Sequence, residues 1–401
     1  MCQRLWFLVY VVVSVQAFGA TPDADVILSS GRLDAGIVEL QSHLKVQPKD
    51  DVARFGLGVT QFVRAVQQLG QKLAVFGPRP RFALADSIDV ADVPVPAELL
   101  TYAKLRTINQ EWLDDLAKVE ATLSKVQSEE VKLPLHVGRV ALNLGTAETR
   151  SLTLIPILRN FRLTPDNREG DFTIVFDRAD VDWLRGYCHL LAAVSELALA
   201  YDAEGLFDVA SHRLFQHAQT RHTFLLESPR SPNRGWFGSV EEISDLIAII
   251  HMIRFPVIEP SRTSVALKHI EDAVGLSRQM WKRILAETDD DREWIPSPKQ
   301  SGAINVKVTQ EMVDNWTKAL DEAESVLQGK KLIPFWRGKP NRGVNVRKIF
   351  LEPLPFDLVL WGQGTAATPY LEEGILTAPE TWQQINRAFG GQFFGFGLWF
   401  N

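Results

Sequence analysis

Two long stretches of this chain carry apolar side chains at alternating steps of three and four residues, which is the spacing of one face of an α-helix. The apolar positions are Val52, Phe55, Val59, Phe62, Val66, Leu69 and Leu73 in the first stretch, and Leu105, Ile108, Trp112, Leu116, Val119, Leu123 and Val126 in the second. Helices with such narrow apolar seams bury them by packing along one another at shallow angles. We therefore expect a helical bundle, with a polar, proline-containing surface loop over 77–96 between these two helices.

Further helices are expected in the middle of the chain. An apolar helix over 181–201, a turn over 202–205 and a return helix over 206–226 would form a hairpin. The remaining expected helices cover 240–253, 264–287 and 308–327.

Other parts of the chain have a different character. Short β segments are expected at 135–142 and 172–176, where β-branched and aromatic residues gather. The last 71 residues, 331–401, are rich in Gly, Pro and aromatic residues. The elements expected there are short strands at 348–351 and 356–361 and a short helix near 381–389. We expect the aromatic end of the chain to dock onto the helical body.

Residues 31–69 carry an internal pattern of small, apolar and proline positions. The residues that carry it are Gly36, Leu40, His43, Pro48, Leu57 and Gly58. This segment resembles the tetratricopeptide repeat (TPR): the second helix of one repeat, its closing proline and the first helix of the next. The resemblance implies helical hairpins with a surface that binds proteins or peptides. A generic helical hairpin is the alternative interpretation.

The first nineteen residues have the layout of a secretory signal peptide. Arg4 is their one charge, an apolar run follows over 5–15, and the small residues Ala17 and Gly19 come after it. The run is shorter than the roughly 20 residues that cross a bilayer. We therefore expect an exported protein, periplasmic or secreted, with no stable membrane span after cleavage. An uncleaved membrane anchor or a buried first helix is the alternative.

Net charge and cysteine content limit the partners and the disulfide bonds that we expect. The net charge of −6 argues against nucleic acid and anionic membranes as partners. Cleavage of the signal peptide would remove Cys2 and leave Cys188 alone. No internal disulfide would then be possible, and we expect Cys188 to be buried in a helix as a small apolar group.

The patterns together predict a mainly α fold of helical hairpins or a bundle, with a TPR-like N-terminal part, minor β segments and an irregular aromatic C-terminal region. The expected organisation is a signal peptide at 1–19, a TPR-like helical region at 20–130, a central α-helical domain at 131–330 and a C-terminal region at 331–401.

Candidate metal ligands are found in the expected central hairpin, at His189, Asp208, His212 and His217. His189 and His217 lie at similar distances from the turn over 202–205, so an antiparallel pair of helices would place them at similar heights. Asp208 lies four residues before His212 and is placed to orient its imidazole.

Two observations weaken this metal hypothesis. Successive steps of five residues from His212 to His217 to His222 rotate each side chain by about 140°, so all three cannot face one ion. The chain also contains no His-Glu-x-x-His motif. No cofactor is predicted, and a divalent metal remains the alternative.

Motifs of common enzyme classes are weak or missing. Residues 362–367 match the dinucleotide fingerprint Gly-x-Gly-x-x-Ala, but Pro369 interrupts the helix that should follow, which favours a tight turn. Gly-x-Ser-x-Gly does not occur. The sequence favours a protein- or peptide-binding scaffold. The alternative is a metal-binding protein or periplasmic enzyme with its site in the histidine-containing hairpin.

Overall fold

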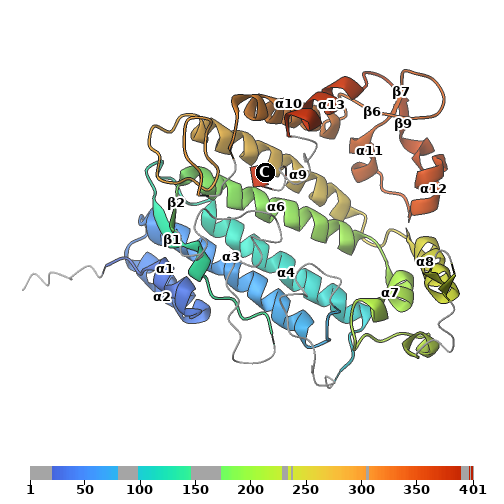
Figure 1. The fold of residues 1–401 in the computed structure, drawn as a ribbon, viewed down its shortest axis with the longest axis horizontal. Helices are drawn as coiled ribbons and strands as arrows, with labels where there is room; N and C mark the ends of the chain where they lie inside the picture. Colours follow the sequence, from blue (N-terminus) through green and yellow to red (C-terminus); the bar gives the residue numbers. More distant parts are fainter. Residues whose placement is uncertain are drawn as a thin grey trace, which may run out of the picture.

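The computed structural model describes residues 20–79, 98–145, 173–227, 234–235, 238–303, 307–389, 397 and 399–400. The expected signal peptide at 1–19 and most of the expected loop at 77–96 lie outside these residues. The described chain is mainly α-helical with a few short antiparallel strands, as the sequence predicts (Figure 1).

Four long helices lie side by side in a layer at the centre of the molecule (Figure 1). They are α3 (Asp51–Ala74), α4 (Tyr102–Leu123), α6 (Arg178–Ala200) and α9 (Ser261–Ile284). The two sequence stripes form α3 and α4, which confirms the helices expected there. The side chains of Asp50, Thr101 and Asp177 accept hydrogen bonds from backbone N–H groups in the first turns of α3, α4 and α6. These caps fix where the helices begin.

Two short helices cover the α3 side of the layer. They are α1 (Ala24–Ser30) and α2 (Leu33–Val46). A Cβ at Gly36 would lie 2.2 Å from a methyl carbon of Ile27, so glycine allows α1 and α2 to approach closely. The pair α2 and α3 forms a hairpin over the TPR-like segment, and the ring of His43 contacts Asp50 at 2.8 Å beside its turn. A generic hairpin has the same form, so the TPR resemblance stays a prediction.

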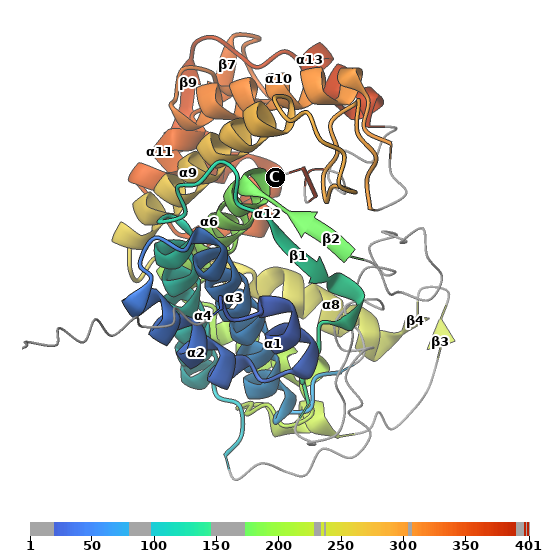
Figure 2. The same cartoon turned by 90° about the vertical axis from the view of Figure 1, so that its left-hand side faces the viewer.

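The opposite side of the layer carries the C-terminal elements (Figure 2). The helices there are α10 (Gln310–Leu327), α11 (Val346–Leu351), α12 (Leu358–Gln363) and α13 (Pro379–Ala388). Helix α10 packs on α9, and α13 packs on α10. A 3₁₀ segment, η5 (Thr365–Tyr370), follows α12. Gly364 ends α12 with a φ of 108°, a conformation that glycine adopts without strain.

The strands predicted at 348–351 and 356–361 are wrong for the most part. Residues 348–351 belong to α11, and only Phe356–Asp357 is extended before α12 begins. The side chain of Asn345 accepts from the N–H of Lys348, and that of Asp357 accepts from the N–H of Leu360. These local caps start two short helices in segments whose apolar runs favoured strands.

Two of the small sheets, β1–β2 and β5–β8, join segments that are distant in sequence. Strand β1 (Leu133–His136) pairs antiparallel with β2 (Thr173–Phe176), which confirms the segment expected at 172–176. Of the segment expected at 135–142, only 135–136 belong to a strand, and Val137–Arg139 form a 3₁₀ turn, η2. The other strands are β3 (Arg234–Gly235), β4 (Gly238–Ser239), β5 (Arg254–Phe255), β6 (Ile333–Pro334), β7 (Arg342–Val344), β8 (Phe356–Asp357) and β9 (Leu371–Glu373). The pairing of β5 with β8 places α8 (Val240–Met252) beside α12.

The predicted return helix over 206–226 is wrong. Helix α7 covers Glu204–Ala210 and continues as one 3₁₀ turn, η3 (Ser211–Arg213); η4 (Thr223–Leu226) is a second 3₁₀ segment. Backbone groups of 214–219 instead bond to two other segments: Gln216 N–H donates to Gly77 O at 2.8 Å, and Leu100 N–H donates to His217 O at 2.9 Å. Phe215 and Ala218 are buried there. These tertiary bonds replace the helical ones.

The main apolar core draws residues from the N-terminal, central and C-terminal parts of the chain. Cys188 is buried in α6, as expected. The C-terminal aromatic end is docked on the helical body, also as expected: the Trp281 indole donates to Phe400 O at 3.3 Å, and that of Trp183 to Trp399 O at 2.9 Å. Within the described part of the chain, no helix has the length and apolarity needed to cross a membrane.

Candidate functional site

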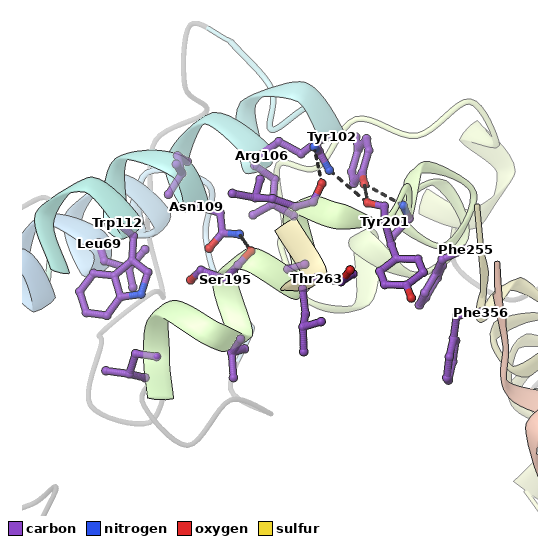
Figure 3. Close-up of a pocket in the computed structure, with 18 of the residues that line it drawn as sticks. Leu69, Tyr102, Arg106, Asn109, Trp112, Ser195, Tyr201, Phe255, Thr263 and Phe356 are labelled. Atoms are coloured by element: carbon purple, nitrogen blue, oxygen red, sulfur yellow. Dashed lines mark hydrogen bonds between the residues drawn. The ribbon is translucent and has the colours of Figure 1, made fainter. Parts of the chain in front are cut away.

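An apolar groove is lined mainly by α4 and α6, with a volume of about 790 Å³ (Figure 3). We call it the α4–α6 groove. Leu69 of α3 and Trp112 of α4 lie at one end, and Phe255 and Phe356 at the other (Figure 3). The volume falls within the roughly 300–1,000 Å³ typical of ligand sites.

The groove follows from the helix periodicity of its two walls. Tyr102, Leu105, Asn109 and Trp112 recur at steps of three and four on α4 and turn toward it. Residues Leu191, Val194, Ser195 and Ala198, spaced at i, i+3, i+4 and i+7, lie on one face of α6. Val194 remains 67% exposed although it is an apolar residue of a packed helix. Val194 therefore offers exposed apolar surface in the groove.

The side chains of Arg106 and Asn109 in the groove are engaged by the protein itself. The guanidinium of Arg106 donates to Tyr201 O at 3.1 Å, to Leu199 O at 2.8 Å and to the Glu259 carboxylate at 2.9 Å. Asn109 Nδ2 donates to Ser195 O at 3.3 Å. Figure 3 shows the bonds of Arg106 to Tyr201 and of Asn109 to Ser195. An occupant therefore finds apolar surface and few hydrogen-bond partners.

The wall formed by β5 and β8 separates the groove from a smaller cavity of about 260 Å³. Phe255 and Phe356 stack at this wall with ring centroids 5.9 Å apart. Tyr201, Ile349 and Phe356 line both cavities. The two cavities therefore adjoin, and the apolar surface continues from the α4–α6 groove toward α12.

A second candidate region is a cluster of carboxyl groups at the start of α6. Ligand atoms of Asp177, Glu287 and Glu293 lie within 4.8 Å of one another, so these three residues are the described group best spaced to hold a divalent cation. Protons also neutralise such a cluster. Burial, followed by the nearby Asp177 carboxylate, raises the pKa of Glu287 to about 8 and that of Glu293 to about 7. Burial and Asp177 likewise raise the pKa of Asp180.

A third region joins α4, α6 and α9 through two histidines. The Nδ1 atoms of His189 on α6 and His269 on α9 are 2.8 Å apart. The other ring nitrogen of His189, Nε2, lies 3.7 Å from the Glu120 carboxylate on α4. Burial opposes ionisation of Glu120, but His189 and Arg185 bring its pKa below the ordinary value. Burial, and then His189, lower the pKa of His269.

The four metal candidates from the sequence are found in different environments. His189 faces His269. Asp208 pairs with Arg221, and its backbone carbonyl accepts from Thr220. Because α7 ends at Ala210, the expected antiparallel hairpin, which would have placed His189 and His217 at similar heights, does not form.

The remaining two candidates lie in the segment after α7. The buried Nδ1 of His212 has no hydrogen-bond partner, and burial, with Arg213, lowers the pKa of the ring. His217 lies in the segment that bonds to Phe76 and Leu100 through its backbone. Among the described residues, no three of the four candidates form a group with ligand spacing.

Sequence reasoning missed Glu120 and His269 as partners of His189. His269 is 80 residues away in sequence and Glu120 is 69 residues away, so no local spacing links them. Both positions fall on correctly expected helices. Only the side-by-side order of α4, α6 and α9 brings them together.

Comparison with protein-family models, curated proteins and solved structures finds no match for this chain. The function has to be inferred from the residues themselves.

Proposed function

We propose that this protein is a scaffold that binds a partner protein or peptide by taking its apolar side chains into the α4–α6 groove. The observation that carries the proposal is the groove's apolar lining, in which the side chains of Tyr102, Arg106, Asn109 and Thr263 already bond to the protein. Burial of apolar surface supplies about 25 cal/mol per Å² and needs no hydrogen-bond exchange. The TPR-like segment at 31–69 supports the same class, because helical-repeat surfaces commonly bind peptides.

Charge favours a neutral apolar segment over an anionic lipid. Arg106 is the one charged residue among the described residues that line the groove, and Glu259 already pairs with it. A phosphate or carboxylate headgroup would therefore compete with an existing ion pair. The net charge of −6 also disfavours anionic membrane surfaces.

A neutral fluorescent probe tests the groove. N-phenyl-1-naphthylamine should bind the purified full chain, and an uncharged amphipathic peptide with leucines at i, i+3, i+4 and i+7 should displace it. Val194→Asp places a charge in the groove at a position that is 67% exposed, so the fold should tolerate it while probe and peptide binding weaken. Val46→Asp is the matched control, because Val46 is a helical valine 64% exposed and outside the groove lining.

The outcomes separate the classes of partner. Peptide binding that is lost in Val194→Asp and kept in Val46→Asp supports the proposal. Equal binding by both variants would refute it. Binding to phosphatidylglycerol vesicles without binding to the peptide would replace the peptide with a lipid.

We also propose that the protein is exported and works in the periplasm or outside the cell. The support is the signal-like layout of residues 1–19. Expression of the full chain in a bacterium, followed by N-terminal sequencing of the periplasmic or secreted product, tests this. A chain that begins at or just after Gly19 is expected. An intact chain in the cytoplasm would contradict the proposal.

A further inference from the structure

The imidazole rings of His189 on α6 and His269 on α9 meet between the two helices. Their Nδ1 atoms are 2.8 Å apart and their ring centroids are 5.1 Å apart, which is the geometry of an N–H···N hydrogen bond. A neutral imidazole has one N–H donor and one bare nitrogen that accepts, whereas a protonated imidazole has two donors and no acceptor. The pair therefore keeps its hydrogen bond only while one of the two Nδ1 atoms carries no proton.

Glu120 of α4 makes His189 the ring that takes a first added proton more easily. Its carboxylate lies 3.7 Å from Nε2 of His189, and Nε of Arg185 lies 3.1 Å from each oxygen of that carboxylate. A carboxylate on this side favours a proton at Nε2. A protonated His189 still donates from Nδ1 to a neutral His269, so one positive charge on the pair leaves the hydrogen bond intact.

His269 is the ring that has to stay neutral. Burial, followed by the neighbouring His189, lowers the pKa of His269, and Lys268 acts in the same direction. The carboxylates of Glu196 on α6 and Asp272 on α9 act in the opposite direction but do not outweigh these effects. The folded chain therefore resists the second added proton.

Other charged groups on the elements packed against α9 are engaged away from the pair. Within the described residues, the ion pairs from α10 and α11 to α9 join Asp321 and Glu324 to Arg278, and Arg347 to Glu271. The charges that face the two rings are therefore those of Glu120, Arg185, Glu196, Lys268 and Asp272.

We propose that the His189–His269 pair is a pH-sensitive joint, which links α6 to α9 while one ring is neutral and loses this contact when both rings are protonated. Two protonated rings would direct two N–H donors and two positive charges at each other. Histidine in an unfolded chain titrates near pH 6.5, so the unfolded chain takes up the second proton below that pH before the folded chain does. The folded state should therefore lose stability as the pH falls below 6.5, until the folded chain also takes up the proton.

Urea denaturation of the full chain at pH 7.5, 6.5 and 5.5 tests the joint. His269→Asn is the informative variant, because its amide lies near the position of Nδ1 but takes up no proton. Between pH 6.5 and 5.5 the unfolding equilibrium constant of the wild type should rise several-fold more than that of His269→Asn, with about tenfold as the limit for one proton. His251→Asn, at an exposed histidine of α8, is the control and should keep the wild-type pH dependence. Equal pH dependence of the wild type and His269→Asn would overturn the proposal.

Nitrogen-15 NMR of the wild-type chain with labelled histidines tests the joint without any variant. At pH 7.5 we expect a scalar coupling between the two Nδ1 nuclei across the hydrogen bond, and a reversible loss of that coupling on acidification. One ring of the pair should titrate with a midpoint below 6.5. Absence of the coupling at pH 7.5, or a coupling that persists after both rings have titrated, would contradict the joint.

Discussion

Arg106 of α4 donates to the backbone carbonyl of Leu199, in the last turn of α6, at 2.8 Å. The last four carbonyls of a helix have no partners within the helix, and a cation near them is favoured by the helix dipole. Arg106 of α4 thereby donates a hydrogen bond to a carbonyl group in the last turn of α6. The same bond forms the polar edge of the α4–α6 groove, so the groove and the helix layer share a stabilising contact.

Replacing this side chain should destabilise the fold. Arg106→Met keeps much of the apolar stem but removes the donors to Leu199 and Tyr201, and we expect a loss of about 2 kcal/mol in the free energy of unfolding. Urea denaturation measures it. Lys282→Met removes an exposed cation of α9 and should change stability by less than about 0.5 kcal/mol. Equal effects of the two substitutions would contradict the capping role of Arg106.

Asp182 is a fully buried carboxylate whose charge is balanced by arginines. Arg178 lies 2.7 Å from it, Arg185 lies 3.3 Å away, and Arg283 also pairs with it. Asp182→Asn should leave these cations poorly compensated and reduce the free energy of unfolding by about 3–5 kcal/mol. Asp321→Asn, at a surface ion pair 62% exposed on the Asp side, should cost less than about 1 kcal/mol. Comparable losses would show that burial of Asp182 is unimportant.

The carboxyl cluster predicts a pH dependence. The pKa of Glu287 rises from an ordinary 4.5 to about 8 in the folded chain, and that of Glu293 to about 7. The folded state holds these protons more tightly than the unfolded chain does. The two carboxyls therefore stabilise the folded state fully below pH 4.5, and this stabilisation is lost as the pH rises through 7 and 8. Glu287→Gln should therefore raise the melting temperature at pH 8.5 relative to the wild type and have little effect at pH 5.

The size of this effect is limited by solvent. Glu287 is only partly buried, so we expect a gain on the order of 1 kcal/mol at pH 8.5. Glu39→Gln, on an exposed face of α2, is the control and should shift the melting temperature equally at both pH values. A wild-type stability that climbs steadily from pH 5 to 8.5, with no difference from Glu287→Gln, would rule out proton sharing in the cluster.

The aromatic end of the chain should be essential for stability. Phe400 is fully buried against Trp281 and Phe389, with ring centroids at 4.7 and 5.4 Å. Phe400→Ala should lower the free energy of unfolding by about 3–5 kcal/mol, because it leaves a cavity in the core. Phe224→Ala, at a phenylalanine 66% exposed, should have a small effect in the same denaturation assay. A Phe400→Ala protein as stable as the wild type would show that the docked end adds little to the free energy of unfolding.

The sequence predicted helices best where their apolar period was long and uninterrupted. The stripes beginning at Val52 and Leu105 became α3 and α4, because an amphipathic helix buries such a stripe in almost any bundle. The return helix over 206–226 did not form, and backbone groups of that segment bond instead to Gly77 and Leu100. The strands expected in the C-terminal region failed because capping side chains at Asn345 and Asp357 started short helices.

Residue patterns alone determined that this chain is mainly helical, that Cys188 is buried and that the aromatic end packs on the body. These properties depend on local periodicity and on the burial of apolar side chains. Only the tertiary structure decided which helices are neighbours. Neighbour order opened the groove between α4 and α6 and placed His269 against His189, since residues 80 positions apart meet only when two helices pack together.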